Sequence, residues 1–269
     1  MPRGPSPPPP RAAGAAVRRA RGGGGEPAGP ARTYLRACAR LGCAPSAGLA
    51  EDLAARSALI VDLRTCDAGT LAAVRAVLGE ASANGLRQVV LMDGITSLGS
   101  DPAYQRLVEA RRRRACRGSL GAPALRALAA SLGPFLAGRG RGLVVLDLAG
   151  APLGRERPGA FGPIVAGLRE GRGRQLQWLG LGGCLIGDAG LAALLPWLAG
   201  RGCPAPSLEA LVLARNGLTD VCLVRALLRS RARLFAQHRA APLRLLDLSG
   251  NPRLGDQALS APGSGVPPA

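Results

Sequence analysis

Few residues of this chain have the side chains and the spacing that catalysis needs. His238 is the sole histidine, and it lies in an arginine-rich stretch rather than beside a cysteine or serine frame. Acid–base and nucleophilic catalysis both require such groups to be held together. We therefore expect His238 to be solvated or to lie at a helix end, and we predict no catalytic residue and no enzymatic activity.

Cysteines and glycine-rich stretches are the remaining candidates for chemistry. Cys38 and Cys43 could begin a zinc site, but no second ligand pair follows at zinc spacing. Both are therefore expected to be ordinary helix cysteines. The glycine-rich stretch at 138–142 lacks the Lys-Ser/Thr that a phosphate loop needs, and the one at 180–183 falls in a strand pattern. The sequence predicts neither a metal nor a cofactor.

The seven cysteines are odd in number and include no Cys-x-x-Cys pair, which favours reduced thiols in an intracellular compartment. The N-terminal region has no continuous apolar stretch, so neither a secretory signal nor a membrane span is predicted. Its arginine- and alanine-rich composition leaves an organelle transit segment open. We expect a cytoplasmic protein, with the nucleus as an open alternative.

All 35 basic residues are arginine, against 17 acidic residues, and the formal net charge is +18. The abundance of Ala, Gly, Pro and Arg also fits GC-rich codons, so the charge alone does not identify a nucleic-acid function. It predicts non-specific polyanion binding that weakens with salt. The few aromatic residues and the lack of a nucleic-acid motif argue against sequence-specific reading of DNA or RNA. The candidate polyanion-binding residues are Arg111, Arg112, Arg113, Arg114 and Arg117, in a predicted basic insert near 99–121.

A repeated leucine pattern runs through most of the chain. The frame Leu-x-x-Leu-x-Leu-x-x-Asn begins at Leu208 and Leu243 and ends on Asn216 and Asn251. The same frame begins at Leu176 with Cys184 in the ninth position. Three earlier frames begin at Ala58, Leu86 and Leu143, with Cys66, Gly94 and Ala151 in the ninth position. The six frames start 28, 57, 33, 32 and 35 residues apart, and the insert near 99–121 accounts for the longest interval.

This pattern resembles the leucine-rich repeat superfamily, and its repeat length is similar to that of the ribonuclease-inhibitor-like subclass. The resemblance covers roughly 58–258 and implies an α/β solenoid, or horseshoe, with parallel strands on the concave face and helices on the convex face. We expect a disordered Pro/Gly/Arg-rich tail at 1–32, a helical N-terminal cap at 33–57, about six repeats at 58–258 and a disordered tail at 259–269.

Three aspartates recur at the starts of predicted helices: Asp188, Asp220 and Asp256. Each is expected to cap its helix by accepting hydrogen bonds from the first N–H groups. After Asp256 only one helical turn is expected before Pro262, so the last repeat would lack its helix. We therefore expect a bare C-terminal end, which leaves open either a truncated chain or a partner that covers that end.

Side chains alternate along a strand, so the residues between the leucines are expected on the concave face. Trp178 is the candidate anchor of a protein interface, with packing against Val145 and Ala210 as the alternative. Asp62, Asp147 and Asp247 are expected to share one register and to form an acidic stripe that would prefer a basic peptide. The predicted protein-binding residues are Asp62, Arg64, Gln88, Met92, Asp147, Trp178, Val212, Arg215 and Asp247.

Together these features predict a monomeric, non-enzymatic protein-interaction scaffold without membrane contact. A weaker resemblance links the chain to the 78-kDa centrosomal leucine-rich-repeat family of centrioles and cilia, through Ile186-Gly187-Asp188 and the basic helix before Asn251. That resemblance implies a role at the cytoskeleton, centrosome or cilium. Two alternatives remain open. One is a GTPase-activating protein of the Ran-activating repeat type, which would require an acidic C-terminal segment, and the other is a basic adaptor that binds RNA or chromatin non-specifically.

Overall fold

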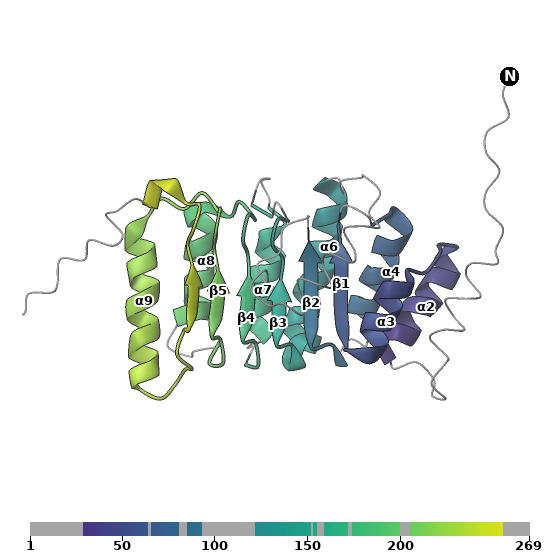
Figure 1. Ribbon diagram of the computed structural model, residues 1–269, viewed down its shortest axis with the longest axis horizontal. Helices are drawn as coiled ribbons and strands as arrows, with labels where there is room; N and C mark the ends of the chain where they lie inside the picture. The colour runs from purple at the N-terminus through teal and green to yellow at the C-terminus, as the bar shows by residue number, and fades with distance from the viewer. Residues whose placement is uncertain are drawn as a thin grey trace, which may run out of the picture.

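The frame leucines and the apolar helical periods between them build alternating strands and helices. The computed structural model describes residues 29–63, 66–80, 85–92, 122–151, 153–154, 159–171, 174–199 and 205–254. Within these ranges the chain is an α/β protein whose six parallel strands follow one another in chain order (Figure 1). The predicted α/β class is confirmed.

The elements have the following bounds. The strands are β1 Ala58–Asp62, β2 Gln88–Met92, β3 Val145–Asp147, β4 Trp178–Gly180, β5 Ala210–Val212 and β6 Leu245–Asp247. The α-helices are α2 Gly29–Leu41, α3 Ala47–Ala55, α4 Ala68–Gly79, α6 Ala122–Pro134, α7 Phe161–Gly171, α8 Gly187–Ala199 and α9 Val221–Ala236. A π-helical turn (η2, Phe135–Arg139) and two 3-10 turns (η3, Gly140–Gly142; η4, Pro252–Leu254) complete them. We call a strand, the turn after it and the following helix a unit.

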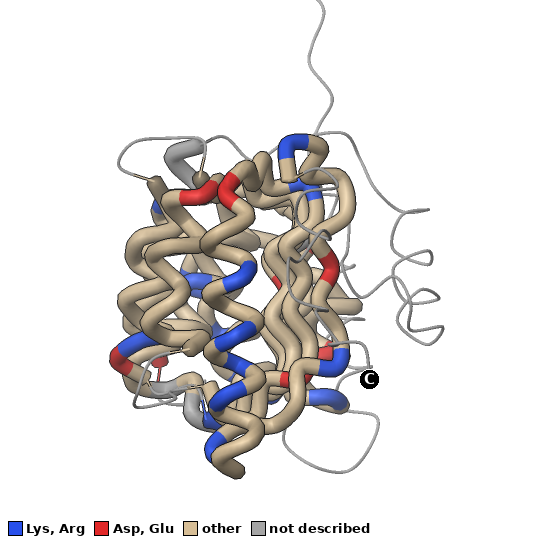
Figure 2. Tube along the Cα trace, turned by 90° about the vertical axis from the view of Figure 1, so that its left-hand side faces the viewer, with Lys and Arg blue, Asp and Glu red and all other residues tan. Residues whose placement is uncertain are grey.

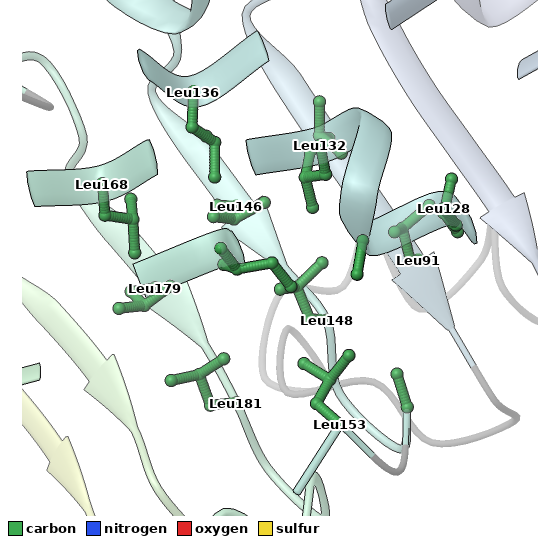
Figure 3. Packing of buried hydrophobic residues seen from close by; sticks show 14 of the residues in the cluster. Leu91, Leu128, Leu132, Leu136, Leu146, Leu148, Leu153, Leu168, Leu179 and Leu181 are labelled. Carbon is green, nitrogen blue, oxygen red and sulfur yellow. The ribbon is translucent and has the colours of Figure 1, made fainter. Parts of the chain in front are cut away.

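Helices α4 and α6 to α9 form a layer on one face of the sheet, which we call the helical face (Figure 2). The other side of the sheet is called the opposite face. Leucines from β2, β3 and β4 interleave with leucines from α6 and α7 between these layers (Figure 3). The main hydrophobic core therefore lies between the sheet and the helices. None of the described helices is long and apolar enough to cross a membrane.

The strands are aligned so that one leucine position forms a continuous row. The row consists of Leu59, Val89, Leu146, Leu179, Leu211 and Leu246. Its first five members are fully buried against the helical face. Each buried side chain of this size stabilises the fold by about 1.5–3 kcal/mol. Five of the six predicted frames, from Leu86 onward, are in this register.

The first frame was predicted two residues too late. Leu59, rather than Val61, pairs with Val89. The backbone agrees, because the carbonyl of Ser57 accepts hydrogen bonds from the next strand just as the second frame residue does in later units. The frame therefore begins at Arg56, and its ninth position is residue 64, outside the described residues, so Cys66 is not a ninth-position residue. The error arose because Leu59, Val61 and Leu63 are apolar and buried on the same face, so the leucine pattern fits equally well two residues later. Alternation cannot detect a shift of two residues, since it leaves each side chain on its face.

Three ninth-position side chains, those of Cys184, Asn216 and Asn251, bind the backbone of the preceding unit. The amide nitrogen of Asn216 donates to the carbonyl of Leu181 at 2.8 Å, and its oxygen accepts the N–H of Ile186 at 3.3 Å. Asn251 repeats this one unit later, donating to the carbonyl of Leu213 at 3.0 Å and accepting the N–H of Leu218 at 3.1 Å, and its oxygen also accepts the N–H of Asn216 at 2.9 Å. These side chains satisfy buried backbone groups and are architectural.

Cys184 takes the same place in the unit before Asn216. Its thiol donates to the carbonyl of Leu148 at 3.1 Å. The thiol is small and fully buried, so it fills the position where an asparagine would otherwise lie. The predicted ninth-position role of Cys184 is confirmed.

Of the three predicted helix caps, Asp220 caps its helix and Asp188 does not. The third, Asp256, lies outside the described residues. Asp220 caps α9 as predicted, accepting the N–H of Cys222 at 2.7 Å and that of Leu223 at 3.4 Å. Asp188 does not cap its own helix, because α8 already begins at Gly187. An aspartate that sequence analysis passed over, Asp67, caps α4.

The carboxylate of Asp188 instead joins two units. It accepts the N–H of Thr219 at 2.9 Å, the N–H of Asp220 at 3.0 Å and the hydroxyl of Thr219. Partial burial alone would raise the pKa of this carboxyl, but the three hydrogen bonds outweigh it and lower the pKa below its usual range. Asp188 therefore fastens the start of α8 to the start of α9 in its charged form.

The two helices predicted between 33 and 57, with a break at 42–45, are α2 and α3. Helix α2 begins earlier than expected, at Gly29, and ends where Gly42 adopts a positive φ of 65°. Ser46 then caps α3 by accepting the N–H of Leu49. Cys43 lies between the two helices, so the expectation that both cysteines are helical holds only for Cys38.

Close packing of α6 against α7 depends on glycines that the sequence analysis did not single out. A Cβ atom added to Gly167 would overlap the carbonyl oxygen of Gly133, and one added to Gly171 would overlap that of Leu136. A Cβ on Gly133 would lie 2.6 Å from the carbonyl oxygen of Pro163. The backbone of α7 therefore touches that of α6 at Gly133 and that of η2 at Leu136, and no side chain fits between them at these points.

We predict that Gly167→Ala destabilises the protein by about 1–3 kcal/mol, because overlap with Gly133 outweighs the roughly 1 kcal/mol that alanine gains in a helix. Gly162→Ala is the matched control on the same helix, since a Cβ there would meet nothing within 4 Å. That control should be neutral or slightly stabilising. Urea unfolding of the two variants measures the difference, and equal midpoints would contradict the close contact.

We also predict a pH dependence from Asp188. Its folded pKa lies below the unfolded value of about 3.9, so its contribution is present above that value and is lost as the pH falls through the folded pKa. Asp188→Asn should therefore lower the urea midpoint relative to wild type at neutral pH, and the difference between the two midpoints should narrow as the pH falls below the unfolded value of about 3.9 and through the lower folded pKa. A gap that stays constant with pH would show that the charged form is not what binds Thr219 and Asp220.

Candidate functional site

The predicted binding residues of the opposite face fall into three rows. One row contains Gln88, Val145, Trp178, Ala210 and Leu245, and the next contains Val90, Asp147, Gly180, Val212 and Asp247. Asp62 lies one row further on, where it pairs with Met92. Asp147 and Asp247 share a row as expected, but Asp62 does not. The predicted three-member acidic stripe is therefore wrong, because it relied on the misplaced first frame.

The middle row of the opposite face is buried except at Asp247, although the helices cover the other side of the sheet. Ile60, Val90, Asp147 and Val212 are all at most 3% exposed. Asp147 and Val212 were predicted to be available to a partner, and this is corrected. Alternation along a strand shows which face a side chain takes, but it does not show whether that face is covered.

The aspartates of this row stabilise the turns after their strands. Asp147 accepts the N–H of Ala149 at 3.0 Å, and Asp247 accepts the N–H of Ser249 at 2.9 Å. A side-chain bond to the backbone two residues on is an Asx turn. This local role explains why aspartate recurs here without a ligand.

Trp178, the predicted anchor, is half-buried in its row between Val145 and Ala210. Its indole nitrogen is buried and donates to no acceptor among the residues described. This environment favours a role for Trp178 in packing against Val145 and Ala210 over a role as the exposed anchor of an interface. Gln88, Asp62 and Asp247 are half-buried as well.

The remaining predicted residues are scattered. Arg215 is exposed, but it lies in the turn after β5 with a φ of 54°. An added Cβ at Gly250 would lie 2.6 Å from the Cγ of Arg215, so glycine makes room for this arginine. Arg64, the side chain of Met92 and the insert arginines Arg111, Arg112, Arg113, Arg114 and Arg117 lie outside what the structure describes.

The end of the sheet at β6 is a different kind of surface. The frame leucines of inner units, such as Leu176, Leu179 and Leu181, are fully buried. Their β6 equivalents, Leu243, Leu246 and Leu248, are only half-buried. Among the described residues, no further unit covers them in the way that the next unit covers each earlier strand. The sequence analysis predicted a bare end but named no residue in it.

Helix α9 adds two exposed apolar side chains to the same end. Leu228 is 45% exposed and Phe235 is 51% exposed. In α8 the corresponding residue after the buried Leu194 is Leu195, which is half-buried. The flank of α8 that carries Leu195 also carries Asp188, which binds the start of α9. By the same helical geometry, Leu228 and Phe235 face away from α8, toward the end of the sheet.

We call Leu228, Phe235, Leu243, Leu246, Leu248 and the outer edge of β6 the terminal face. It combines apolar side chains with backbone groups that are bonded in every earlier strand. Exposed apolar patches beside an unpaired strand edge are typical of interaction sites.

The surroundings of the terminal face are strongly basic. Residues 221–254 contain seven arginines and a single acidic residue, Asp247. Figure 2 views the molecule from this end, with α9 and β6 nearest the viewer. Arg229 and Arg233 are exposed on the outer side of α9. Arg244 forms an exposed ion pair with Glu209 at 3.3 Å.

One arginine of this group is not a surface residue. Arg231 is 3% exposed and donates to the carbonyls of Leu208 at 2.7 Å, Ala205 at 2.9 Å and Ala241 at 2.9 Å. It ties the segment before β5 to the segment before β6. The helical spacing with Val224, Leu227 and Leu234 was the signal that could have identified it.

The surroundings of the cysteines and of His238 do not favour a reactive side chain. Burial raises the pKa of Cys38 to about 11 and that of Cys66 to about 12, and it raises the pKa of Cys184 further. These thiols are therefore protonated at neutral pH. His238 is exposed just after α9, as expected. No group of three potential metal ligands occurs within the described ranges.

Comparison with known proteins adds no relative. No family model matches the chain. No curated protein and no solved structure matches it either.

We predict that Arg231→Met destabilises the protein by about 2–4 kcal/mol, because it leaves three buried carbonyls without their donor. Arg233→Met is the matched control, since Arg233 is exposed on the same helix, and it should change stability by less than about 0.5 kcal/mol. Thermal unfolding compares the two. Similar losses in both variants would show that Arg231 acts only through the charge of α9.

Proposed function

We propose that the chain is a leucine-rich-repeat protein that acts as a non-enzymatic protein-interaction scaffold, and that it binds its partner through the terminal face. The repeat assignment is supported by the single register of the frame leucines and by the ninth-position side chains that bond the preceding turn. The family itself is a proposal carried by these features of the chain.

One observation carries the interaction role: the terminal face exposes apolar side chains that inner units bury. Leu246 and Leu248 are half-buried where their equivalents are fully buried, and Phe235 is half exposed. Covering such side chains gains about 25 cal/mol per Å² of apolar surface. A protein partner supplies that cover, whereas a small ligand or a polyanion does not.

We expect Leu228→Ser/Phe235→Ser to weaken partner binding at least about tenfold, because apolar anchors carry most of the binding energy at an interface. The matched control is Leu41→Ser/Leu185→Ser, which removes two leucines that are about equally exposed, at 50% and 46%, but lie elsewhere. Affinity capture with mass spectrometry at low and high salt finds the partner. Rebinding of the purified partner to all three proteins then measures the affinities.

The outcomes separate the alternatives. Binding that survives high salt and is lost only in the terminal-face variant supports the proposal. Loss of every partner at high salt favours a non-specific polyanion adaptor. Binding that is lost in Trp178→Ala but kept in the terminal-face variant moves the site to the opposite face. Stimulated GTP hydrolysis by a captured GTPase would replace the scaffold with a GTPase-activating role.

A further inference from the structure

We propose that the terminal face takes an extended segment of a partner protein as an additional strand, and that this segment alternates apolar residues after an acidic stretch. The inference rests on the proposed function and specifies the chemistry of the partner. It follows from three separate properties of the terminal face: its backbone, its apolar side chains and its charge.

The backbone edge of β6 repeats a pattern that the earlier strands use for pairing. The carbonyls of Ser57, Arg87, Val144, Gln177 and Glu209 each accept two N–H groups from the next strand. The N–H groups of Leu148, Leu181 and Leu213 each donate to the next strand. In β6 the same positions are the carbonyl of Arg244 and the N–H of Leu248, and they have no such partner within the described ranges. A strand that arrives here finds a preformed hydrogen-bonding edge.

The apolar side chains of this edge require alternation in the segment that covers them. Leu246 and Leu248 point to the helical face two residues apart and are half-buried. Leu228 and Phe235 extend the apolar surface along α9. In an added strand every second side chain points to this side. Alternating apolar residues would therefore fill the space that the next unit fills elsewhere in the sheet.

The basic residues near β6 predict which residues precede the apolar residues in the partner segment. Arg239 and Arg244 lie just before β6, so they lie beside the residues that precede a parallel added strand. The ion pair of Arg244 with Glu209 is exposed and contributes little, so it can exchange. Acidic residues in that part of the partner meet both guanidinium groups. A second copy of this chain would instead bring the exposed arginines of its own α9 and of the segment before β6 to the contact, and like charges oppose that pairing.

The test uses the full chain and synthetic peptides. The probe is a fluorescent peptide with a run of glutamates followed by alternating leucine and serine. One control peptide replaces the glutamates by lysines, and the other replaces the leucines by serines. We expect fluorescence anisotropy to show the probe binding at least about tenfold more tightly than either control.

Variants locate the binding site. Arg239→Ser/Arg244→Ser should weaken the probe roughly fivefold, whereas Arg229→Ser/Arg233→Ser, which removes the same charge from the outer side of α9, should change it by less than about twofold. Leu228→Ser/Phe235→Ser should abolish binding. Hydrogen exchange should slow at the N–H groups of Leu248 and Gly250 when the probe is bound.

Three results would overturn the proposal. Equal binding of the all-serine peptide would mean simple polyanion attraction. Protection that appears away from β6 would place the site elsewhere. Sedimentation that shows a dimer, dissolved by Leu228→Ser/Phe235→Ser, would make a second copy the occupant. If the probe fails while a captured partner still depends on Leu228 and Phe235, only the strand-addition proposal falls and the scaffold function stands.

Discussion

The fold depends on polar side chains that satisfy buried backbone across the boundaries between units. Backbone carbonyl and N–H groups are buried in the turn after each strand. Each such group left without a hydrogen-bond partner lowers the free energy of unfolding by about 1–3 kcal/mol. Cys184, Asn216 and Asn251 supply the missing partners from the following unit. The same neighbouring unit therefore supplies both apolar contacts and hydrogen-bond partners, and a unit that loses its neighbour loses both.

This dependence has a direction, because the side chains of Cys184, Asn216 and Asn251 each reach back to the unit before their own. Asp188 links units the other way, from α8 to the start of α9. The terminal face is what the same geometry produces where no further unit follows among the described residues. Its leucines are only half-buried, whereas the equivalent leucines of inner units lie in the core, and the exposed arginines nearby favour the acidic partner proposed above.

Sequence reasoning located the strands from β2 onward and the helices between them, because leucine spacing specifies register wherever one face of a strand is apolar. It misplaced β1 by two residues, because Leu59, Val61 and Leu63 are all apolar on one face and alternation cannot detect a shift of two. It placed Asp147 and Val212 on the correct face but could not foresee that this face is buried there. Asp188 and Asp220 occupy the same position of the sequence pattern, so both were predicted to be helix caps. Asp220 caps its own helix, whereas Asp188 binds Thr219 and Asp220 at the start of the next helix. Arg231 could have been recognised from its spacing with the buried residues of α9.

The open edge of β6 also bears on how long the molecule survives in a cell. Local opening requires least free energy where side chains are half-buried and strands are unpaired, so unfolding should begin at this end. Opening the last unit removes the hydrogen bonds of Asn251 to the preceding turn, and this destabilises the preceding unit in turn. A bound partner that holds β6 in place raises the stability of the whole chain by mass action. Proteases that cut the opened form would then clear unoccupied molecules first, so the amount of this protein would follow the amount of its partner.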